Sequence, residues 1–155
     1  MTSETNYCVL VIKPMTIGRA EGPLVLKDLL STGDFRIVRK TPFNMCRNTW
    51  IALEDISRGT ESEFGFESFI KNTSTRDRVS WVMIVKHRDG VTDPTDLLNK
   101  LLGPVDPSKW KYSHLRYKYA RVGNCSLDDV AFVSPKSKAN LTAMILIKDF
   151  KEEEI

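Results

Sequence analysis

The sequence predicts a single α+β domain, a ferredoxin-like split β-α-β sandwich with a four-stranded antiparallel sheet and helical insertions. The first observation is size and composition: 155 residues, 41% hydrophobic and 28% charged, suit one globular domain. The second is the order of the apolar patterns, which reads strand, helix, strand, helices, strand, helix, long loop, strand, helix. We expect one domain over residues 1–150, followed by an acidic C-terminal tail at 151–155.

The first half of the chain predicts two strands and three helices. Residues 7–12 form an uninterrupted apolar run that ends shortly before a proline, which indicates a strand buried on both faces. Residues 24–30 carry apolar side chains at helical spacing, and residues 35–39 return as a short strand. Two short helices are expected over residues 41–57 and 61–72.

The second half predicts two strands, two helices and one long loop. Residues 79–85 are rich in β-branched and aromatic side chains, and a leucine-spaced helix follows from Asp93 to its glycine stop at Gly103. Residues 103–128 show little hydrophobic periodicity, which indicates a long surface loop, and loops of this length often contain functional residues. Residues 130–133 predict the last strand and residues 138–147 the last helix.

Several classes of protein are excluded by composition. No apolar run approaches the roughly 20 residues of a membrane-spanning helix, so no membrane association is expected. The first dozen residues lack the basic region of a signal or transit peptide. The three cysteines are widely spaced and show no metal-binding or disulfide pattern, which favours a reduced, cytoplasmic protein without a metal.

Three short motifs carry a resemblance to a known family. Residues 9–14 read Val-Leu-Val-Ile-Lys-Pro, residues 33–38 read Gly-Asp-Phe-Arg-Ile-Val, and residues 102–107 read Leu-Gly-Pro-Val-Asp-Pro. In order and spacing these motifs resemble the nucleoside diphosphate kinase family, and the match spans residues 6–147. The resemblance implies a nucleoside-diphosphate-kinase-like fold. It also implies a reaction in which a histidine takes the terminal phosphate of a nucleoside triphosphate and passes it to a diphosphate.

The resemblance implies an eroded nucleotide site. Lys13 matches the lysine that approaches the phosphates, and Arg116 matches an arginine with the same role. A second phosphate-binding arginine aligns with Asn99, where neighbouring Lys100 offers a substitute charge. Phe64 is a candidate for the ring that stacks on the base, with Phe66 and core packing as alternatives. The implied ligand is ADP or ATP with Mg²⁺.

Ser134 stands where the family has its phosphate-accepting histidine. A serine hydroxyl without an adjacent base is a poor nucleophile near neutral pH, and a phosphoserine would be too stable to pass its phosphate on. The neighbouring Ala131 and Pro135 replace further family residues. We therefore expect no catalytic residue here and interpret Ser134 as the N-cap of the last helix. Neither His87 nor His114 occupies the position of the missing histidine.

The segment 109–121 concentrates positive charge and aromatic rings. It carries five basic residues and no acid, which leaves a net −2 for the rest of a chain whose total is +3. Cations interleaved with rings suit RNA or a ribonucleoprotein, through phosphate contacts and base stacking. The alternative is an interface with a protein partner or a second copy of the chain. The residues proposed for this surface are Lys109, Trp110, Lys111, Tyr112, Tyr117, Lys118 and Arg121.

The function expected from the sequence is therefore that of a pseudoenzyme. It would be a catalytically inactive binding module of the nucleoside-diphosphate-kinase type that docks to a larger assembly and could keep a nucleotide. The first alternative is a divergent active kinase with another acceptor residue. The second is an RNA-binding or ribosome-associated factor that uses the segment 109–121.

Overall fold

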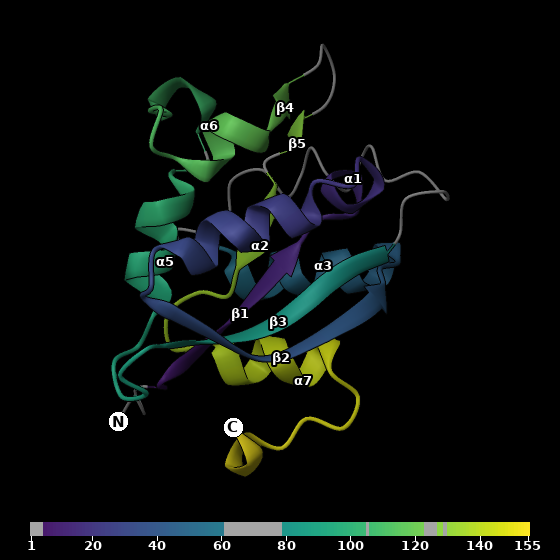
Figure 1. Cartoon of the computed structure of the whole chain (residues 1–155). Coiled ribbons are helices and arrows are strands. Elements are labelled where there is room, and N and C mark those ends of the chain that lie inside the picture. The colour runs from purple at the N-terminus through teal and green to yellow at the C-terminus, as the bar shows by residue number, and fades with distance from the viewer. Residues whose placement is uncertain (1–4, 61–78, 105, 123–126, 129) are drawn as a thin grey trace.

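A four-stranded antiparallel sheet forms the centre of the fold (Figure 1). The computed structural model describes residues 5–60, 79–104, 106–122, 127–128 and 130–155. The strand order is β2-β3-β1-β6, and every pairing is antiparallel. The strands are β1 (Tyr7–Ile12), β2 (Phe35–Asn44), β3 (Val79–His87) and β6 (Ala131–Val133). The predicted fold class is confirmed.

The central strand β1 is buried on both faces, as its uninterrupted apolar run predicts. Successive side chains of a strand point to opposite faces, and the two sets of β1 enter two different cores. Tyr7, Val9 and Val11 belong to one core. Cys8, Leu10 and Ile12 belong to the other. This one strand therefore joins the two hydrophobic halves of the domain.

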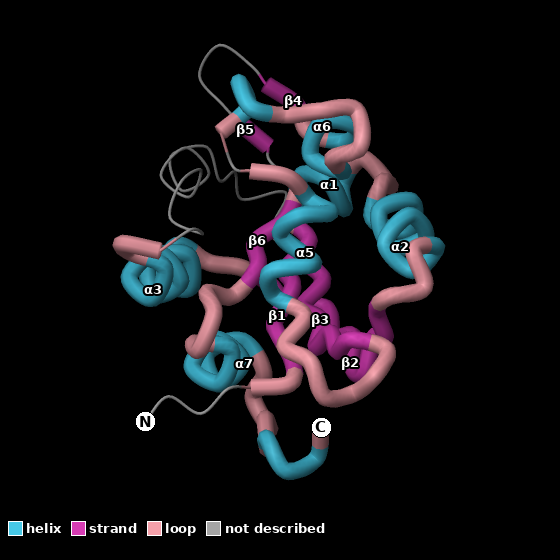
Figure 2. The backbone as a smooth tube through the Cα atoms, turned by 90° about the vertical axis from the view of Figure 1, so that its left-hand side faces the viewer, coloured by secondary structure: helices cyan, strands magenta, loops and turns pink. Residues whose placement is uncertain are grey.

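Two pairs of helices cover the two faces of the sheet (Figure 2). On one face, α2 (Gly22–Ser31) and α5 (Thr95–Leu102) bury valine and leucine side chains in the core that contains Leu10. On the other face, α3 (Arg47–Ser57) and α7 (Ala139–Leu146) pack around Trp50. The short helix α1 (Pro14–Gly18) follows β1 directly.

One predicted helix boundary was wrong. Residues 41–44 were expected to be helical, but they continue β2, where Thr41 pairs with Val82 and Asn44 pairs with Val79. Helix α3 therefore begins at Arg47. Backbone pairing with β3 outweighs the weak helical pattern of these residues. The predicted helix at 61–72 lies outside the described residues.

Strand β2 forms one edge of the sheet and is irregular. Its register against β3 shifts between Ile37 and Arg39, which leaves Val38 without a partner residue. Pro42 also lies within the strand, and proline is tolerated in sheets mainly at edges because it has no N–H to donate.

The segment that follows α5 is more ordered than its lack of periodicity indicates. It contains a 3-10 turn (Pro107–Lys109), the short helix α6 (Leu115–Tyr119) and a two-stranded ribbon of β4 (Arg121–Val122) and β5 (Leu127–Asp128). Helix α6 contacts both α2 and α5 and buries Leu115 and Tyr119 in the core.

The C-terminal residues also differ from the frayed tail that we expected. Glu152–Glu154 form a 3-10 turn, and both Phe150 and Ile155 pack in part against the core around Trp50. Among the described residues, no helix is long and apolar enough to cross a membrane.

Candidate functional site

Lys13 lies at the end of β1, where the resemblance places a phosphate-binding lysine. Its backbone N–H donates to the carbonyl of Val130 at 2.9 Å, which extends the pairing between β1 and the chain entering β6. The whole residue is only 1% exposed. A lysine is rarely buried to this degree unless its ammonium group has partners. Lys13 is therefore part of the protein interior in this arrangement, not a cation displayed on a surface.

Arg116 is a second buried cation, held between the end of α5 and the start of β6. Its Nη2 donates to the carbonyl of Ala131 at 2.9 Å, and its Nη1 donates to the carbonyl of Gly103. The residue is 3% exposed. Hydrogen bonds from a charged guanidinium are among the stronger ones in proteins. Arg116 thus ties the segment after α5 to the sheet.

Gly103 and His114 complete this junction. Gly103 has φ +93°, and a Cβ atom built on it would lie 2.5 Å from Cγ of His114. The His114 Nδ1 accepts a hydrogen bond from the N–H of Lys111 at 3.0 Å. Only glycine fits beneath this imidazole, and the ring is engaged in holding the loop. A catalytic role for His114 gains no support from these contacts.

Ser134 has a structural partner that the sequence does not reveal. Its Oγ accepts the backbone N–H of Val9 at 2.9 Å, and its own N–H donates to the carbonyl of Val9 at 2.9 Å. The residue is fully buried. Ser134 therefore extends the pairing of β6 with β1, and its interpretation as a helix N-cap was wrong because α7 begins at Ala139 and is preceded by Lys138.

The structure brings Lys13 and Arg116 to the same place but separates them from Ser134. The backbone N–H of Lys13 and the guanidinium of Arg116 both donate to the short stretch formed by Val130 and Ala131. Ser134 lies three residues further along the strand, about 10 Å away at the spacing of an extended chain. The described contacts thus place no base and no exposed cation beside the Ser134 hydroxyl.

Lys100 and Phe64 do not join this group in the described contacts. Lys100 lines a separate pocket with His87 and Lys136. Phe64 lies outside the described residues, as does Phe66. At Asn99 the described contact is its carbonyl, which accepts the N–H of Gly103 at 2.9 Å and closes the helix α5.

The residues at the implied nucleotide site are cations, which suit a phosphate, but their side chains are buried. Lys13 and Arg116 are cations at the expected positions, yet a phosphate could reach them only if their side chains moved from the interior. In the part of the chain that the structure describes, no group of three or more metal-binding side chains gathers.

We define the basic aromatic segment as residues 109–121, and the structure divides it into an anchored part and a displayed part. Asp28 on α2 accepts hydrogen bonds from Lys118 Nζ at 2.8 Å and Tyr119 Oη at 2.5 Å. The Trp110 Nε1 donates to the carbonyl of Pro104 at 2.6 Å. The hydrogen bond from Lys118 is the main cause that lowers the pKa of Asp28. Asp28 is an anchor that no sequence motif indicated.

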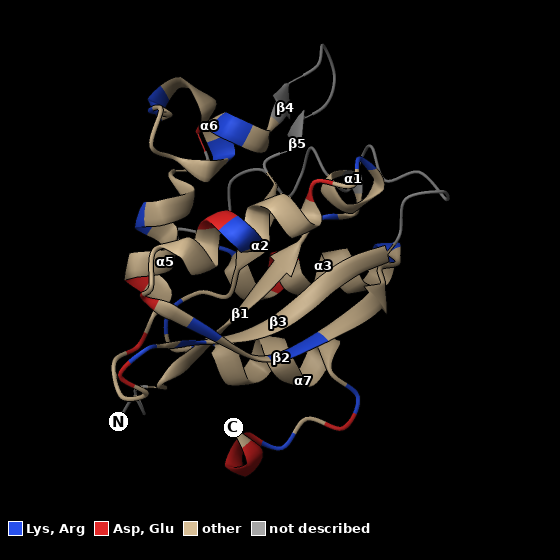
Figure 3. Cartoon of the chain, viewed as in Figure 1, with Lys and Arg blue, Asp and Glu red and all other residues tan. Residues whose placement is uncertain are grey.

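The displayed part consists of two tyrosines and two lysines. Tyr112 is 88% exposed and Tyr117 is 49% exposed, and their rings meet edge to face with centroids 5.2 Å apart. Lys109 and Lys111 are exposed nearby in sequence. In Figure 3 the blue segments of α6 mark the basic residues of this helix. The side chain of Arg121 lies outside the described part of the structure.

The four-stranded antiparallel sheet and its covering helices define an α+β protein, and solved structures show that its fold is that of the nucleoside diphosphate kinases. Neither a scan against protein-family models nor a search of curated proteins finds a match to this sequence. Solved structures do match. The nucleoside diphosphate kinase from Aquifex aeolicus superposes with a TM-score of 0.70 at 14% identity, over 97% of this chain and 98% of that chain.

Two further matches have ligands bound. The enzyme from Borrelia burgdorferi, a transition state mimic with vanadate and ADP, gives a TM-score of 0.71 at 17% identity, over 96% of this chain and 89% of that one. The enzyme from Halobacterium salinarum in complex with CDP gives 0.67 at 13% identity, over 96% and 94%. At these identities the likeness establishes the fold, which agrees with the resemblance that the sequence motifs carry.

Proposed function

We propose that this protein is a binding module that uses the nucleoside diphosphate kinase fold without its phosphotransfer reaction. The proposal rests on the burial and the hydrogen bonding of Ser134. Ser134, which the resemblance aligns with the family's histidine, is fully buried, and its Oγ accepts a backbone hydrogen bond from Val9. A covalent phosphotransfer intermediate needs an accessible nucleophile within reach of a base.

The direct test is incubation of the full chain with γ-labelled ATP. Acid-labile protein phosphate is measured first, and transfer to a nucleoside diphosphate acceptor second. We expect neither, because no described group combines a free nucleophile with a base. Labelling of the protein together with turnover would contradict the proposal and favour an active kinase with another acceptor.

The variant Ser134→His should not restore the reaction. An imidazole is much larger than the buried hydroxymethyl group that it would replace, and the cations of the site would still be in the interior. Phosphoryl transfer depends on positioning and on charge stabilisation, so a nucleophile alone recovers little. Turnover in this single variant would show that the remaining site is competent.

We include weak nucleotide binding in the proposal. Its support is the presence of ADP and CDP in two of the matching structures and the position of Lys13 and Arg116. The burial of both side chains argues that binding is weak. A ligand at about 100 times its dissociation constant adds roughly 2.7 kcal/mol to stability, which a thermal shift assay detects.

The nucleotide test compares variants with their own ligand-free baselines. ADP should raise the unfolding midpoint of the parent and of the surface variant Lys111→Ala, but not of Arg116→Lys. If ADP at millimolar concentration leaves the parent unchanged, nucleotide binding is removed from the proposal, while the loss of phosphotransfer stands on its own assay.

RNA is the second candidate partner, favoured by the displayed Tyr112 and Tyr117 pair beside Lys109 and Lys111. Each base stacked on an aromatic ring contributes about 1–3 kcal/mol, and each phosphate contact adds about 0.7 to the slope of log affinity against log salt in single strands. Lys118 contributes less than the sequence suggested because Asp28 pairs with it.

The RNA test uses fluorescence anisotropy with a labelled oligouridine at several salt concentrations. The double variant Lys109→Ala with Lys111→Ala should lower the slope by about 1.4, since two phosphate contacts are lost. The exposed helix variant Lys27→Ala is the matched control. An unchanged slope would assign the basic aromatic segment to a protein interface instead.

A further inference from the structure

A pocket of about 740 Å³ lies at the end of the sheet opposite to Lys13. Along β1, Tyr7 pairs with Lys86 at this end and Ile12 pairs with Trp81 at the other, so the pocket is well separated from the two buried cations. Its walls come from Thr5, two residues before β1, the end of β3, the loop after β3, helix α5 and the chain after β6. Its volume is within the roughly 300–1,000 Å³ that is usual for small-molecule sites.

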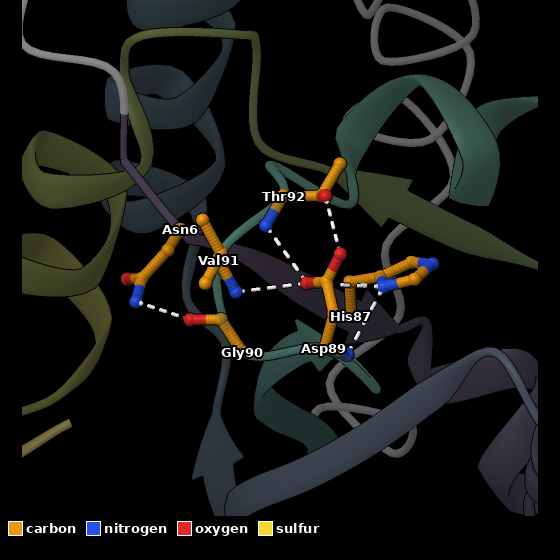
Figure 4. A network of polar contacts seen from close by, with 6 residues as sticks. All are labelled: Asn6, His87, Asp89, Gly90, Val91 and Thr92. Carbon is orange, nitrogen blue, oxygen red and sulfur yellow. Dashed lines mark hydrogen bonds and ion pairs between the residues drawn. The ribbon is translucent and has the colours of Figure 1, made fainter.

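One wall of this pocket is held rigid by Asp89 (Figure 4). Its carboxylate accepts the N–H groups of Val91 at 2.8 Å and Thr92 at 2.9 Å, and also the Thr92 hydroxyl at 2.5 Å. Asn6 Nδ2 donates to the carbonyl of Gly90 at 3.0 Å from the other side. These bonds fix the loop after β3 before any ligand arrives, which lowers the entropic cost of binding.

The same loop orients the imidazole of His87, which lines the pocket. Its Nδ1 accepts the backbone N–H of Asp89 at 3.2 Å. In the neutral ring this hydrogen bond leaves the proton on Nε2, which becomes a donor. Figure 4 shows this second nitrogen turned away from Asp89. His87 therefore offers one N–H group that the loop does not use.

Among the described charges that line the pocket, the Lys100 ammonium and the Asp93 carboxylate have no ion-pair partner. Lys136 Nζ lies 2.6 Å from Asp96 Oδ2, so these two lining charges balance each other. Asp93 Oδ1 accepts both the N–H and the hydroxyl of Thr95, at 2.9 and 2.6 Å. Lys100 makes no hydrogen bond or ion pair with any part of the chain that the structure describes. The pocket thus presents the free ammonium of Lys100.

The lining also includes apolar surface. Val91 is 80% exposed on the loop, and Leu97 adds a partly buried side chain from α5. A ligand with only a charged head would leave this surface in water. A ligand with an attached apolar body would bury it and gain the free energy of that burial.

We propose that this pocket binds a small organic anion, with a carboxylate or phosphate head held by Lys100 and His87 and an apolar body against Val91 and Leu97. The Lys100 ammonium would supply charge and the His87 N–H a directed hydrogen bond, which together would give strength and orientation. The site goes beyond the proposed function, since it shares no residue with the junction of Lys13 and Arg116.

The test is a titration of the full, isotope-labelled chain followed by NMR. Phenyl phosphate and benzoate are the probes with an apolar body, and inorganic phosphate is the probe without one. We expect saturable shifts of the His87 ring signals and of the Val91 and Thr92 amides, with phenyl phosphate or benzoate binding more tightly than inorganic phosphate. The probe with the higher affinity identifies the preferred head.

Matched variants show whether the pocket is responsible. Lys100→Ala should weaken binding of the better probe by about tenfold, as expected for loss of a charge-assisted contact. Lys100→Arg should retain it, and the exposed helix variant Lys27→Ala should bind like the parent. The proposal is overturned if neither probe gives saturable shifts at tens of millimolar, if Lys100→Ala binds like the parent, or if the shifts fall on the basic aromatic segment.

Discussion

Replacing Ser134 with alanine tests the structural role that we assign to its hydroxyl. The Oγ accepts the N–H of Val9 at 2.9 Å, and both residues are fully buried. The variant leaves this N–H in the interior without its partner and without room for water. An unpaired buried donor costs about 1–3 kcal/mol.

That cost converts into a measurable change of melting temperature. For a domain of about 150 residues each kcal/mol shifts the midpoint by about 2–4 °C, so the expected loss is roughly 2–12 °C. Urea unfolding gives the free energy directly, and faster hydrogen exchange at the Val9 amide would locate the effect. Ser113→Ala is the matched control, because Ser113 is exposed.

The outcome that refutes the reasoning is equal stability of the two alanine variants. Surface substitutions usually stay within about 0.5 kcal/mol of the parent. If Ser134→Ala falls in that range, the hydroxyl is not held by Val9, and its availability as a nucleophile would have to be considered again.

Three further predictions follow from buried or paired groups. The pKa of Asp28 is lowered from 3.8, chiefly by the hydrogen bond from Lys118, so its contribution to stability is present above that value and is lost as the pH falls through the lower folded pKa. Asp28→Asn should therefore reduce the loss of unfolding free energy on acidification, measured by urea unfolding across the acid range. If the parent and the variant lose the same free energy on acidification, Asp28 does not hold Lys118 and Tyr119 as described. Burial raises the pKa of the Cys8 thiol well above its usual range, while Cys46 is exposed, so brief alkylation of the folded protein should modify Cys46 before Cys8, and comparable rates for these two thiols by mass spectrometry would contradict the buried assignment. Gly103→Ala should cost about 1–3 kcal/mol in urea unfolding because φ is +93° there, and a neutral result would mean that the junction relaxes easily.

The fold could be predicted from the sequence because its central features are local patterns. The apolar run of β1 and the leucine spacing of α5 each mark an element without reference to distant residues. The extension of β2 through Pro42 could not be predicted in this way. Its residues include a proline and alternate between exposed and partly buried, and they form a strand because β3 supplies the partner backbone.

The motifs made Lys13 and Arg116 candidate residues but did not indicate their environment. The backbone N–H of Lys13 and the side chain of Arg116 both donate to the short stretch at the start of β6. The carbonyl groups that hold the Arg116 guanidinium belong to Gly103 and Ala131, more than ten residues away on either side, and no local pattern encodes these contacts. The same is true of Ser134, whose partner Val9 lies 125 residues earlier in the chain.

The irregular edge strand β2 has a consequence for association between copies of the chain. An exposed strand edge can add a strand from a neighbouring molecule, and proteins commonly block this with proline, a bulge or positive charge. All three occur in β2, as Pro42, the register shift at Val38, and the exposed Arg36, Arg39 and Lys40. Two such edges brought together would repel each other electrostatically. A homo-oligomer of this protein is thus not expected to join its subunits by pairing one β2 with another.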